Sequence, residues 1–393
     1  MKALLDEKAD VVVLDARRFD EYQTMSIPGG ISVPGAELVL RVAELAPDPA
    51  TRVIVNCAGR TRSIIGTQSL VNAGIPNPVS ALRNGTIGWT LAGQQLEHGQ
   101  ARRFAEVSAD TRQAAALRAR AVADRAQVAR IDRAGLRQWQ ADAARTTYLF
   151  DVRTPEEYEA GHLPGSRSTP GGQLVQETDH VASVRGARLV LVDDDGVRAN
   201  MSASWLAQMG WEVAVLDGAG AADFSEPGAW SAPLPAKPQA ETITPQTLAD
   251  WLRAPGTAVL DFTASANYVK RHIPGAAWAL RSQLRQALAT LGDADRYVLT
   301  CGTSLLARFA VPDVAALTDK PVFLLEGGTS AWVAAGQPTE EGESLLAAPR
   351  IDRYRRPYEG TDNPREAMQG YLDWEFGLVE QLGRDGTHGF YVI

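Results

Sequence analysis

Residues 53–66 read VIVNCAGRTRSIIG and combine the features of a strand, a loop and the start of a helix. The run VIV is β-branched, as a buried central strand requires, and the apolar period becomes helical after Ser63. Residues 57–62 form the loop between them. The loop begins with Cys57, at the point where free backbone N–H groups and the helix dipole converge. This setting favours the thiolate form of the cysteine.

Two arginines, Arg60 and Arg62, lie in the same loop. An anion that arrives there would meet their fixed positive charges in addition to the N–H donors. The loop therefore predicts a nucleophile, Cys57, inside an anion-binding cradle. A small, buried and inert cysteine beside a solvated basic turn is the alternative, and it is the common situation of a free cysteine. The rest of the chain decides between the two interpretations.

The pattern around this loop occurs three times along the chain. In each copy a strand ends in an aspartate, an aromatic residue and an Ile/Leu-Pro-Gly turn follow, and a second apolar strand leads into a loop. The aspartates are Asp15, Asp151 and Asp261, and the loops begin at Cys57, Asp193 and Cys301. Three copies of alternating strands and helices predict an α/β fold in which helices cover both faces of parallel sheets. Ligands of such sheets bind at the carboxyl ends of strands, where all three loops lie.

The second copy carries a family resemblance. Residues 151–165 read DVRTPEEYEAGHLPG and resemble the signature DVR-x-x-x-E-[FY]-x-x-G-H-[IL]-P-G of rhodanese domains. Cys57 with Arg62 and Ser63 is similar to the Cys-x4-Arg-Ser/Thr active-site loop of rhodanese sulfurtransferases. The similar phosphatases and arsenate reductases have a longer Cys-x5-Arg loop. The resemblance covers about residues 1–336 and implies three tandem rhodanese-like domains, each with a central parallel sheet and helices on both faces.

The resemblance and the repeats divide the chain into six segments. The aspartate and the Pro-Gly turn of each copy are expected to be scaffolding, the carboxylate capping local N–H groups. Repeats two and three open with a helix, whereas Met1 corresponds almost to the last turn of that helix. Either the edge of the first domain is short or upstream sequence is missing. The expected segments are a domain with the Cys57 loop (1–100), a helical connector (101–130), a domain without the cysteine (131–232), a linker (233–242), a domain with the Cys301 loop (243–337) and a tail with a helix over 367–382 that packs against the domains (338–393).

The three loops differ in the residues that could do chemistry. Repeat two has Asp193 at the position of the cysteine, in an acidic triplet, although Arg198 matches the loop arginine. A carboxylate cannot carry a sulfane sulfur, so we expect this copy to be inactive. Repeat three keeps Cys301 but has Leu306 at the arginine position. We expect a structural or weakly active role there, a possible second site, and Cys57 is the predicted catalytic residue.

The resemblance implies double displacement. The Cys57 thiolate attacks the outer sulfur of thiosulfate, sulfite leaves, and a persulfide on Cys57 waits for cyanide or a thiol. No metal or organic cofactor is implied. The substrate-binding residues would be Arg60 and Arg62, for the sulfonate end, and Ala58, Gly59, Thr61 and Ser63, whose N–H groups would stabilise the persulfide. Two alternatives remain open: 3-mercaptopyruvate as the donor, and a non-catalytic rhodanese scaffold in which Cys57 senses oxidants or passes sulfur to a partner.

Composition bounds the class of protein. The chain has 393 residues of which 45% are hydrophobic, enough for several cores. A net charge of −8 without a dense Lys/Arg block argues against nucleic acid or an anionic membrane as a partner. No apolar run approaches the roughly 20 residues of a membrane span. Two distant cysteines fit a reducing compartment, so we expect a cytoplasmic location, with the oligomeric state left open.

Overall fold

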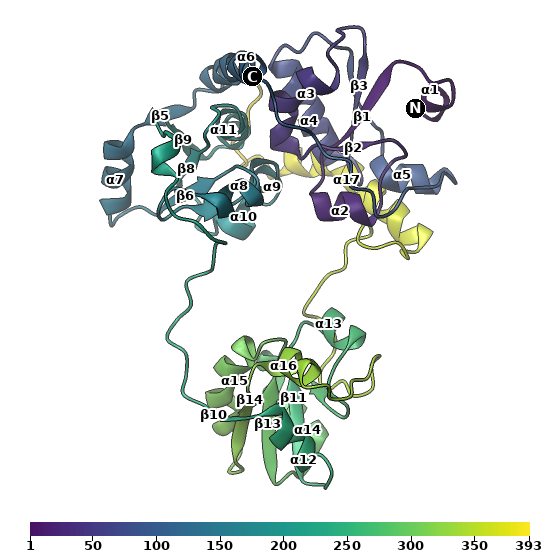
Figure 1. Cartoon of the computed structure of the whole chain (residues 1–393), viewed down its shortest axis with the longest axis vertical. Helices are drawn as coiled ribbons and strands as arrows, with labels where there is room; N and C mark the ends of the chain where they lie inside the picture. Colours follow the sequence, from purple (N-terminus) through teal and green to yellow (C-terminus); the bar gives the residue numbers. More distant parts are fainter. The chain divides into compact units, whose positions relative to one another are not determined.

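The computed structural model describes residues 1–393, which form two compact units (Figure 1). One unit comprises Met1–Ser231 with Arg356–Ile393 and holds repeats one and two together with the C-terminal helix. The other unit, Ala232–Arg355, holds repeat three. No helix in either unit has the length and apolar character that crossing a membrane requires.

Each repeat forms its own sheet, and all paired strands are parallel. In repeat one the strand order is β2 (Ile31–Ser32), β1 (Val11–Asp15), β3 (Arg52–Asn56) and β4 (Val79–Ala81). In repeat two it is β5 (Ala129–Ile131), β9 (Glu212–Leu216), β8 (Arg188–Val192), β6 (Thr147–Asp151) and β7 (Arg167–Ser168). In repeat three it is β10 (Glu241–Ile243), β14 (Val322–Leu325), β13 (Arg296–Thr300), β11 (Thr257–Asp261) and β12 (Ala277–Trp278).

Helices accompany the strands of every repeat. Repeat one has α1 (Lys2–Asp6), α2 (Phe19–Thr24), α3 (Leu38–Leu45), α4 (Thr61–Asn72) and α5 (Gly85–Leu91). Repeat two has α7 (Arg133–Ala141), α8 (Pro155–Ala160), α9 (Gly171–Gln176), α10 (Thr178–Val181) and α11 (Arg198–Gln208). Repeat three has α12 (Pro245–Trp251), α13 (Ser265–Lys270), α14 (Leu284–Leu291), α15 (Leu305–Ala315) and α16 (Gly328–Ala334). The predicted fold class, three parallel α/β domains in tandem, is confirmed.

Both faces of the first sheet are buried, because successive strand residues point to opposite sides. Leu14 and Val55 belong to a core with Leu38 of α3, whereas Val13 belongs to a core with Trp89 of α5. The long apolar strand runs of the sequence follow from this double burial. The faces of the sheet are therefore occupied by the core, and the loops at the strand ends remain for function.

Repeats one and two share a helix. α6 (Ala109–Arg125) begins after Ser108, whose Oγ accepts a hydrogen bond from the Thr111 N–H group. Ala119 of α6 lies in the core of repeat one, and Ala123, one turn later, lies in the core of repeat two. Because one helix contributes to both cores, the two repeats are packed into a single unit.

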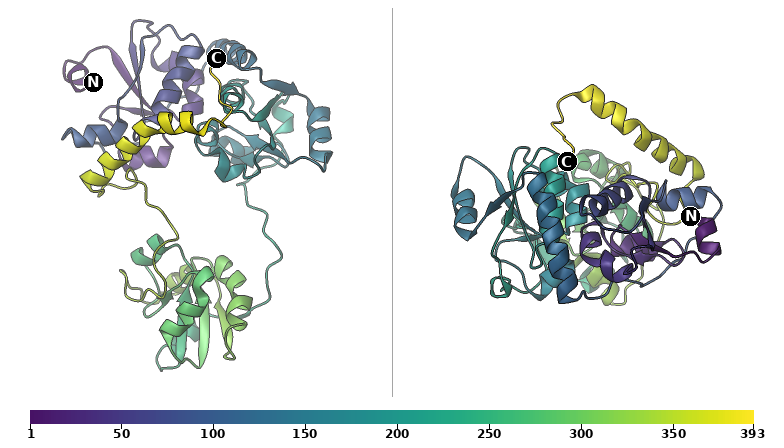
Figure 2. Two further views of the ribbon diagram at one scale, coloured as in Figure 1. Left: turned by 180° about the vertical axis from the view of Figure 1, so that it is seen from behind. Right: turned by 90° about the horizontal axis from the view of Figure 1, so that it is seen from above.

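The segment after repeat three is divided between the two units. Ala347 lies in the core of repeat three, whereas α17 (Arg365–Asp385) packs through Met368 and Leu372 against Ile87 of repeat one. Figure 2 shows α17 in yellow beside α5. The predicted domain bounds stay predictions, but two differ from the elements: β10 begins inside the predicted linker 233–242, and the predicted tail 338–393 is two separately packed segments.

Candidate active site

Cys57 directly follows the inner strand β3, which pairs with β1 on one side and β4 on the other. α4 begins at Thr61, so residues 57–62 form the strand-to-helix loop that the sequence predicts. The Cys57 side chain is 2% exposed. Its Sγ donates to Ser63 Oγ at 3.5 Å, and Ser63 Oγ donates to the Arg60 carbonyl at 2.8 Å. The sulfur therefore lies at the amino end of α4, under the loop.

The backbone N–H groups of residues 58–63 make no hydrogen bond to any other group of the protein. All of these residues except Thr61 are buried or half-buried, where an N–H group without a partner is costly, and the groups converge at a helix amino end. Such a group of donors is suited to an anion. The structure thus provides the donors of the predicted cradle around Cys57.

The carbonyl groups of the same loop are fixed by α5. Cys57 O accepts from the Thr86 N–H group at 2.9 Å, and Ala58 O accepts from the Ile87 N–H group at 3.0 Å. Gly85 precedes these donors with φ +52°, and a Cβ atom on it would lie 2.1 Å from Cys57 O. Only glycine fits there, which explains why a glycine stands at the start of α5, shortly after β4. The loop is held by its carbonyls while its N–H groups stay open.

Arg62 is held by a carboxylate rather than left free. Its two terminal nitrogens donate to the two carboxylate oxygens of Glu21, in α2, at 2.7 and 2.8 Å. Burial opposes the charge of Arg62, but hydrogen bonds and charge from Glu21, with a smaller contribution from Cys57, raise its pKa. Burial opposes the charge of Glu21 as well, and Arg62 nevertheless holds the pKa of Glu21 below its usual value. The pair is charged and rigid.

Arg60 stacks on an aromatic ring. Its guanidinium carbon lies 3.8 Å from the ring centre of Phe376, in α17. Neither arginine is free to point into the cradle, because Arg62 is bound to Glu21 and Arg60 lies on Phe376. The sulfonate-binding role of both arginines stays a prediction.

The arginine–glutamate pair occurs twice in the chain. Arg198 of repeat two donates to Glu157 at 2.5 and 3.1 Å, at the same offset as in repeat one. In repeat three the matching positions hold Leu306 and Asn267, so both partners are missing together. A sequence signal for Glu21 was present in the Glu-Tyr pair before the Pro-Gly turn of repeats one and two, but it did not indicate a role for the glutamate.

The C-terminal helix α17 covers the loop. A Cβ atom on Gly59 would lie 2.6 Å from Glu375 Oε2 and 3.0 Å from Tyr371 Cε1. Glu375 Oε1 accepts from the Thr61 hydroxyl and from the Tyr371 hydroxyl, each at 3.1 Å. The Glu375 side chain is buried, and its Oε2 has no hydrogen-bond partner. Burial first, then Glu375, raises the pKa of Tyr371, which keeps this hydroxyl a donor. Nothing in the sequence indicates that these distant residues meet Cys57.

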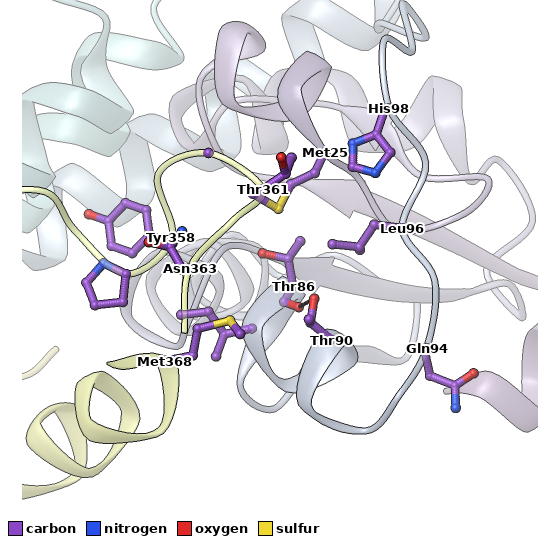
Figure 3. Close-up of a pocket in the computed structure, with 13 residues that line it drawn as sticks. Met25, Thr86, Thr90, Gln94, Leu96, His98, Tyr358, Thr361, Asn363 and Met368 are labelled. Atoms are coloured by element: carbon purple, nitrogen blue, oxygen red, sulfur yellow. Dashed lines mark hydrogen bonds between the residues drawn. The ribbon is translucent and has the colours of Figure 1, made fainter. Parts of the chain in front are cut away.

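Three cavities lie near the loop. One of about 210 Å³ is bounded by α5, the loop that carries His98, and the segment with Tyr358 and Met368, and no residue of the Cys57 loop lines it (Figure 3). Two others, of about 240 and 350 Å³, lie between repeats one and two, and Arg62 lines both. Arg62 is therefore the loop residue that borders both cavities between the repeats.

The loop of repeat two is filled by its own side chains. Asp193 accepts from the Gly196 and Ala199 N–H groups at 3.2 and 2.9 Å. Asp195 accepts from the Val197 and Arg198 N–H groups at 2.6 and 3.2 Å. Burial and the neighbouring Asp195 raise the pKa of Asp193 well above its usual value. Carboxylates of the protein occupy the donors that stay open in repeat one.

Repeat three keeps the thiol but lacks the charges. Cys301 is 3% exposed and lies in the apolar core of its domain, while Leu306 is 62% exposed. Ser304 has φ +63°, and its N–H group bends back to Cys301 O at 3.4 Å. Asp261 has no arginine beside it, whereas the matching Asp15 binds Arg17, and burial raises the pKa of Asp261. Cationic support for a thiolate is absent from this loop.

The aspartates of repeats one and two cap local N–H groups, as predicted, and their scaffolding role stays a prediction. Asp15 accepts from the backbone N–H group of Arg17 and binds its guanidinium, and Asp151 and Arg153 do the same. These pairs lie at the ends of β1 and β6. No group of three or more His, Cys, Asp or Glu side chains is placed to hold a metal ion.

Comparisons with known proteins agree with this architecture. The model of the rhodanese-like domain matches residues 1–92, 132–222 and 244–335. The crystal structure of a thiosulfate sulfurtransferase from Pseudomonas aeruginosa is 85% identical, with a TM-score of 0.98, and the match covers 100% of this chain and 75% of that one. A 3-mercaptopyruvate sulfotransferase from Escherichia coli is 19% identical over 59% of this chain and 97% of that one, with a TM-score of 0.25, too low to bear on activity.

One curated protein shares a single stretch with the chain. An HTH-type transcriptional regulator of Mycobacterium tuberculosis is 32% identical over 93 residues, which are 24% of this chain and 40% of that protein. This chain therefore spans less than half the length of that relative. The family-model matches cover most of the chain in three copies, and the chain belongs to the rhodanese-like domain family.

Proposed function

We propose that this protein is a rhodanese-type enzyme that moves a sulfane sulfur from thiosulfate to a thiophilic acceptor, with Cys57 as the nucleophile. The observation that carries the proposal is the set of open N–H groups over residues 58–63, next to a cysteine at the amino end of α4. The 85% identity to a thiosulfate sulfurtransferase over the whole chain supports the choice of donor. The donor is a small anion, and the acceptor is a thiol or cyanide.

The reaction takes two displacements at one sulfur atom. The Cys57 thiolate attacks the outer sulfur of thiosulfate, the S–S bond of thiosulfate breaks, and sulfite leaves with the electron pair. The persulfide on Cys57 carries its charge near the N–H groups of residues 58–63. The acceptor then attacks the outer sulfur and regenerates the Cys57 thiolate. Sulfur changes partner without an external oxidant or reductant.

The arginines supply positive charge from the two sides of the loop. Arg62 keeps its charge through Glu21 and lines the space between repeats one and two, so it attracts an anionic donor arriving there. Arg60 is placed by Phe376 and contributes from the side of α17. Because Cys57 is 2% exposed, side chains of the loop or α17 must move before thiosulfate touches the sulfur.

The proposal includes a location in the cytoplasm. Cys57 and Cys301 are both free, which fits a reducing compartment such as the cytoplasm. A protein that holds a persulfide between two half-reactions also needs a compartment in which free thiols persist.

Intact-mass measurement after incubation with thiosulfate tests the proposal. We expect a gain of one sulfur atom in the wild type and in Cys301→Ala, and no gain in Cys57→Ala. Parallel incubation with 3-mercaptopyruvate identifies the donor, since the larger gain at equal concentration marks the better substrate. No gain with either donor in the wild type would overturn the catalytic proposal and leave a scaffold.

A further inference from the structure

Glu375 is a buried carboxylate with one oxygen unused. Its side chain is 6% exposed, and it contacts Gly59 two positions after the nucleophile Cys57. Oε1 accepts from the hydroxyl groups of Thr61 and Tyr371, which fixes the orientation of the carboxylate. Oε2 has no donor in the protein. An unpaired buried acceptor is costly, so its position calls for a ligand that donates a proton.

The loop against which Glu375 Oε2 lies has the opposite requirement. The N–H groups of residues 58–63 are donors without acceptors. A ligand that satisfies both Glu375 and the loop must donate a hydrogen to Glu375 and present electron density to the loop N–H groups. Thiosulfate at neutral pH is a dianion without a proton to give, and a carboxylate repels it. A protonated thiol has both features, an S–H donor and a sulfur lone pair.

We propose that Glu375 is the base that takes the proton of a thiol acceptor in the second half-reaction at Cys57. This assignment rests on the proposed function and adds the acceptor class to it. As the S–H bond of the acceptor breaks, the proton moves to Glu375 Oε2 and the acceptor sulfur bonds to the outer sulfur of the persulfide. The persulfide S–S bond breaks, and its electron pair returns to Cys57 Sγ as the thiolate. The proton then leaves to water, so charge and electrons balance.

The surroundings of Glu375 match the task of a base. Two hydroxyl groups support Oε1 and leave Oε2 directed at the loop. The raised pKa of Tyr371 keeps its hydroxyl protonated, so it donates to Glu375 and does not compete for the proton. A base in hydrogen-bond reach of the transferred proton typically contributes about 10²- to 10⁴-fold in rate.

The test is Glu375→Gln, which keeps the shape of the side chain and removes its basicity. The matched control is Glu380→Gln, because Glu380 lies on the same helix and is exposed. Each variant is first loaded with thiosulfate and its persulfide is measured by intact mass. The loaded protein is then mixed with 2-mercaptoethanol, an alkyl thiol protonated at neutral pH, or with 5-thio-2-nitrobenzoate, an aromatic thiol already ionised there. Rates of persulfide loss are compared in single turnovers.

We expect Glu375→Gln to form the persulfide and to react with 2-mercaptoethanol about 10²-fold more slowly than the wild type. Its reaction with the ionised aromatic thiol should be unchanged or faster, and Glu380→Gln should behave as the wild type with both. Equal slowing of both thiols, or no slowing of either, would overturn the role as a base. A wild type that never gains sulfur would instead refute the proposed function. Loading and the ionised thiol also report that the variant is folded.

Discussion

The Cys57 loop of repeat one and the Asp193 loop of repeat two follow the same strand-to-helix plan but differ in what fills their donors. In repeat one the N–H groups of residues 58–63 are open. In repeat two Asp193 and Asp195 accept from four N–H groups of their own loop. The second loop shows that this backbone binds carboxylates when they are supplied. The comparison supports the proposal that the open donors of the first loop form an anion site.

The loop arginines of the two repeats also differ in what they contact. Arg198 of repeat two contacts Glu37 of repeat one at 3.1 Å as well as its own Glu157. Burial opposes the charge of Arg198, but Glu37 and Asp195 hold its pKa well above the usual value. The arginine that corresponds to Arg62 has therefore become part of the contact between the repeats. Arg198 thus links repeat two to repeat one.

Replacing the nucleophile gives the largest expected effect. Cys57→Ser should lower the rate of sulfite release from thiosulfate by about 10³-fold or more, since the displacement has no other thiol at this loop. Cys301→Ser should leave the rate near that of the wild type, because Leu306 replaces the arginine beside Cys301. Steady-state assays with thiosulfate and cyanide measure both. Equal losses in the two variants would contradict the assignment of the site to repeat one.

Replacing Glu21 and Arg62 by the residues of repeat three, Asn and Leu, tests the role of the arginine–glutamate pair. Glu21→Asn alone should cost about 3 kcal/mol of unfolding free energy, because it leaves the Arg62 charge buried without its partner. The double variant Glu21→Asn with Arg62→Leu should recover most of that stability but lose about 10²-fold in kcat/KM for thiosulfate. Urea denaturation and kinetics on the two single variants and the double variant measure this cycle. Recovery of activity together with stability would show that the pair is purely structural.

Loosening α17 tests whether the helix limits access to the first loop. Leu372 is 1% exposed and packs against Ile87, so Leu372→Ala should weaken the docking of α17 by about 2–4 kcal/mol. The expected result is faster alkylation of Cys57 by iodoacetamide, followed by peptide mass spectrometry. Alkylation of Cys301 in the same sample is the internal control and should not change. Equal acceleration at both cysteines would indicate general destabilisation.

The smallest expected effect concerns the pH dependence of the filled loop. Because burial and Asp195 raise the folded-state pKa of Asp193, its contribution favours folding below the unfolded pKa and is lost as pH rises through the folded pKa. Asp193→Asn places a neutral side chain at this position. It should therefore reduce the stability that the wild type loses as pH rises. Hydrogen exchange of the β8 amides, compared between variant and wild type from acidic to alkaline pH, measures the difference. If the difference in exchange rates between variant and wild type did not change with pH, Asp193 would not be the titrating group.

The sequence was sufficient for the fold, because β-branched strand runs, glycine turns and the spacing of three copies can be read from it directly. It also placed Cys57 correctly in the strand-to-helix loop, and its role as the nucleophile stays a prediction. It did not predict the glutamate that holds Arg62, although Glu21 stands in a repeated Glu-Tyr pair. It had no means of predicting Glu375 or Phe376, since their contact with the loop depends on how a distant helix docks. The spacing of residues within one repeat predicts which side chains share a loop. It does not predict which distant segments pack against that loop.

The most direct test of the account is the response of the loop amides to sulfur. Backbone ¹H–¹⁵N chemical shifts are compared before and after loading Cys57 with thiosulfate, under conditions that preserve the persulfide. We expect the signals of residues 58–63 to move, because their N–H groups receive a negative sulfur, while those of residues 194–199 stay in place because Asp193 and Asp195 already accept from their N–H groups. Unmoved signals over 58–63 in a protein whose mass shows the added sulfur would contradict the account.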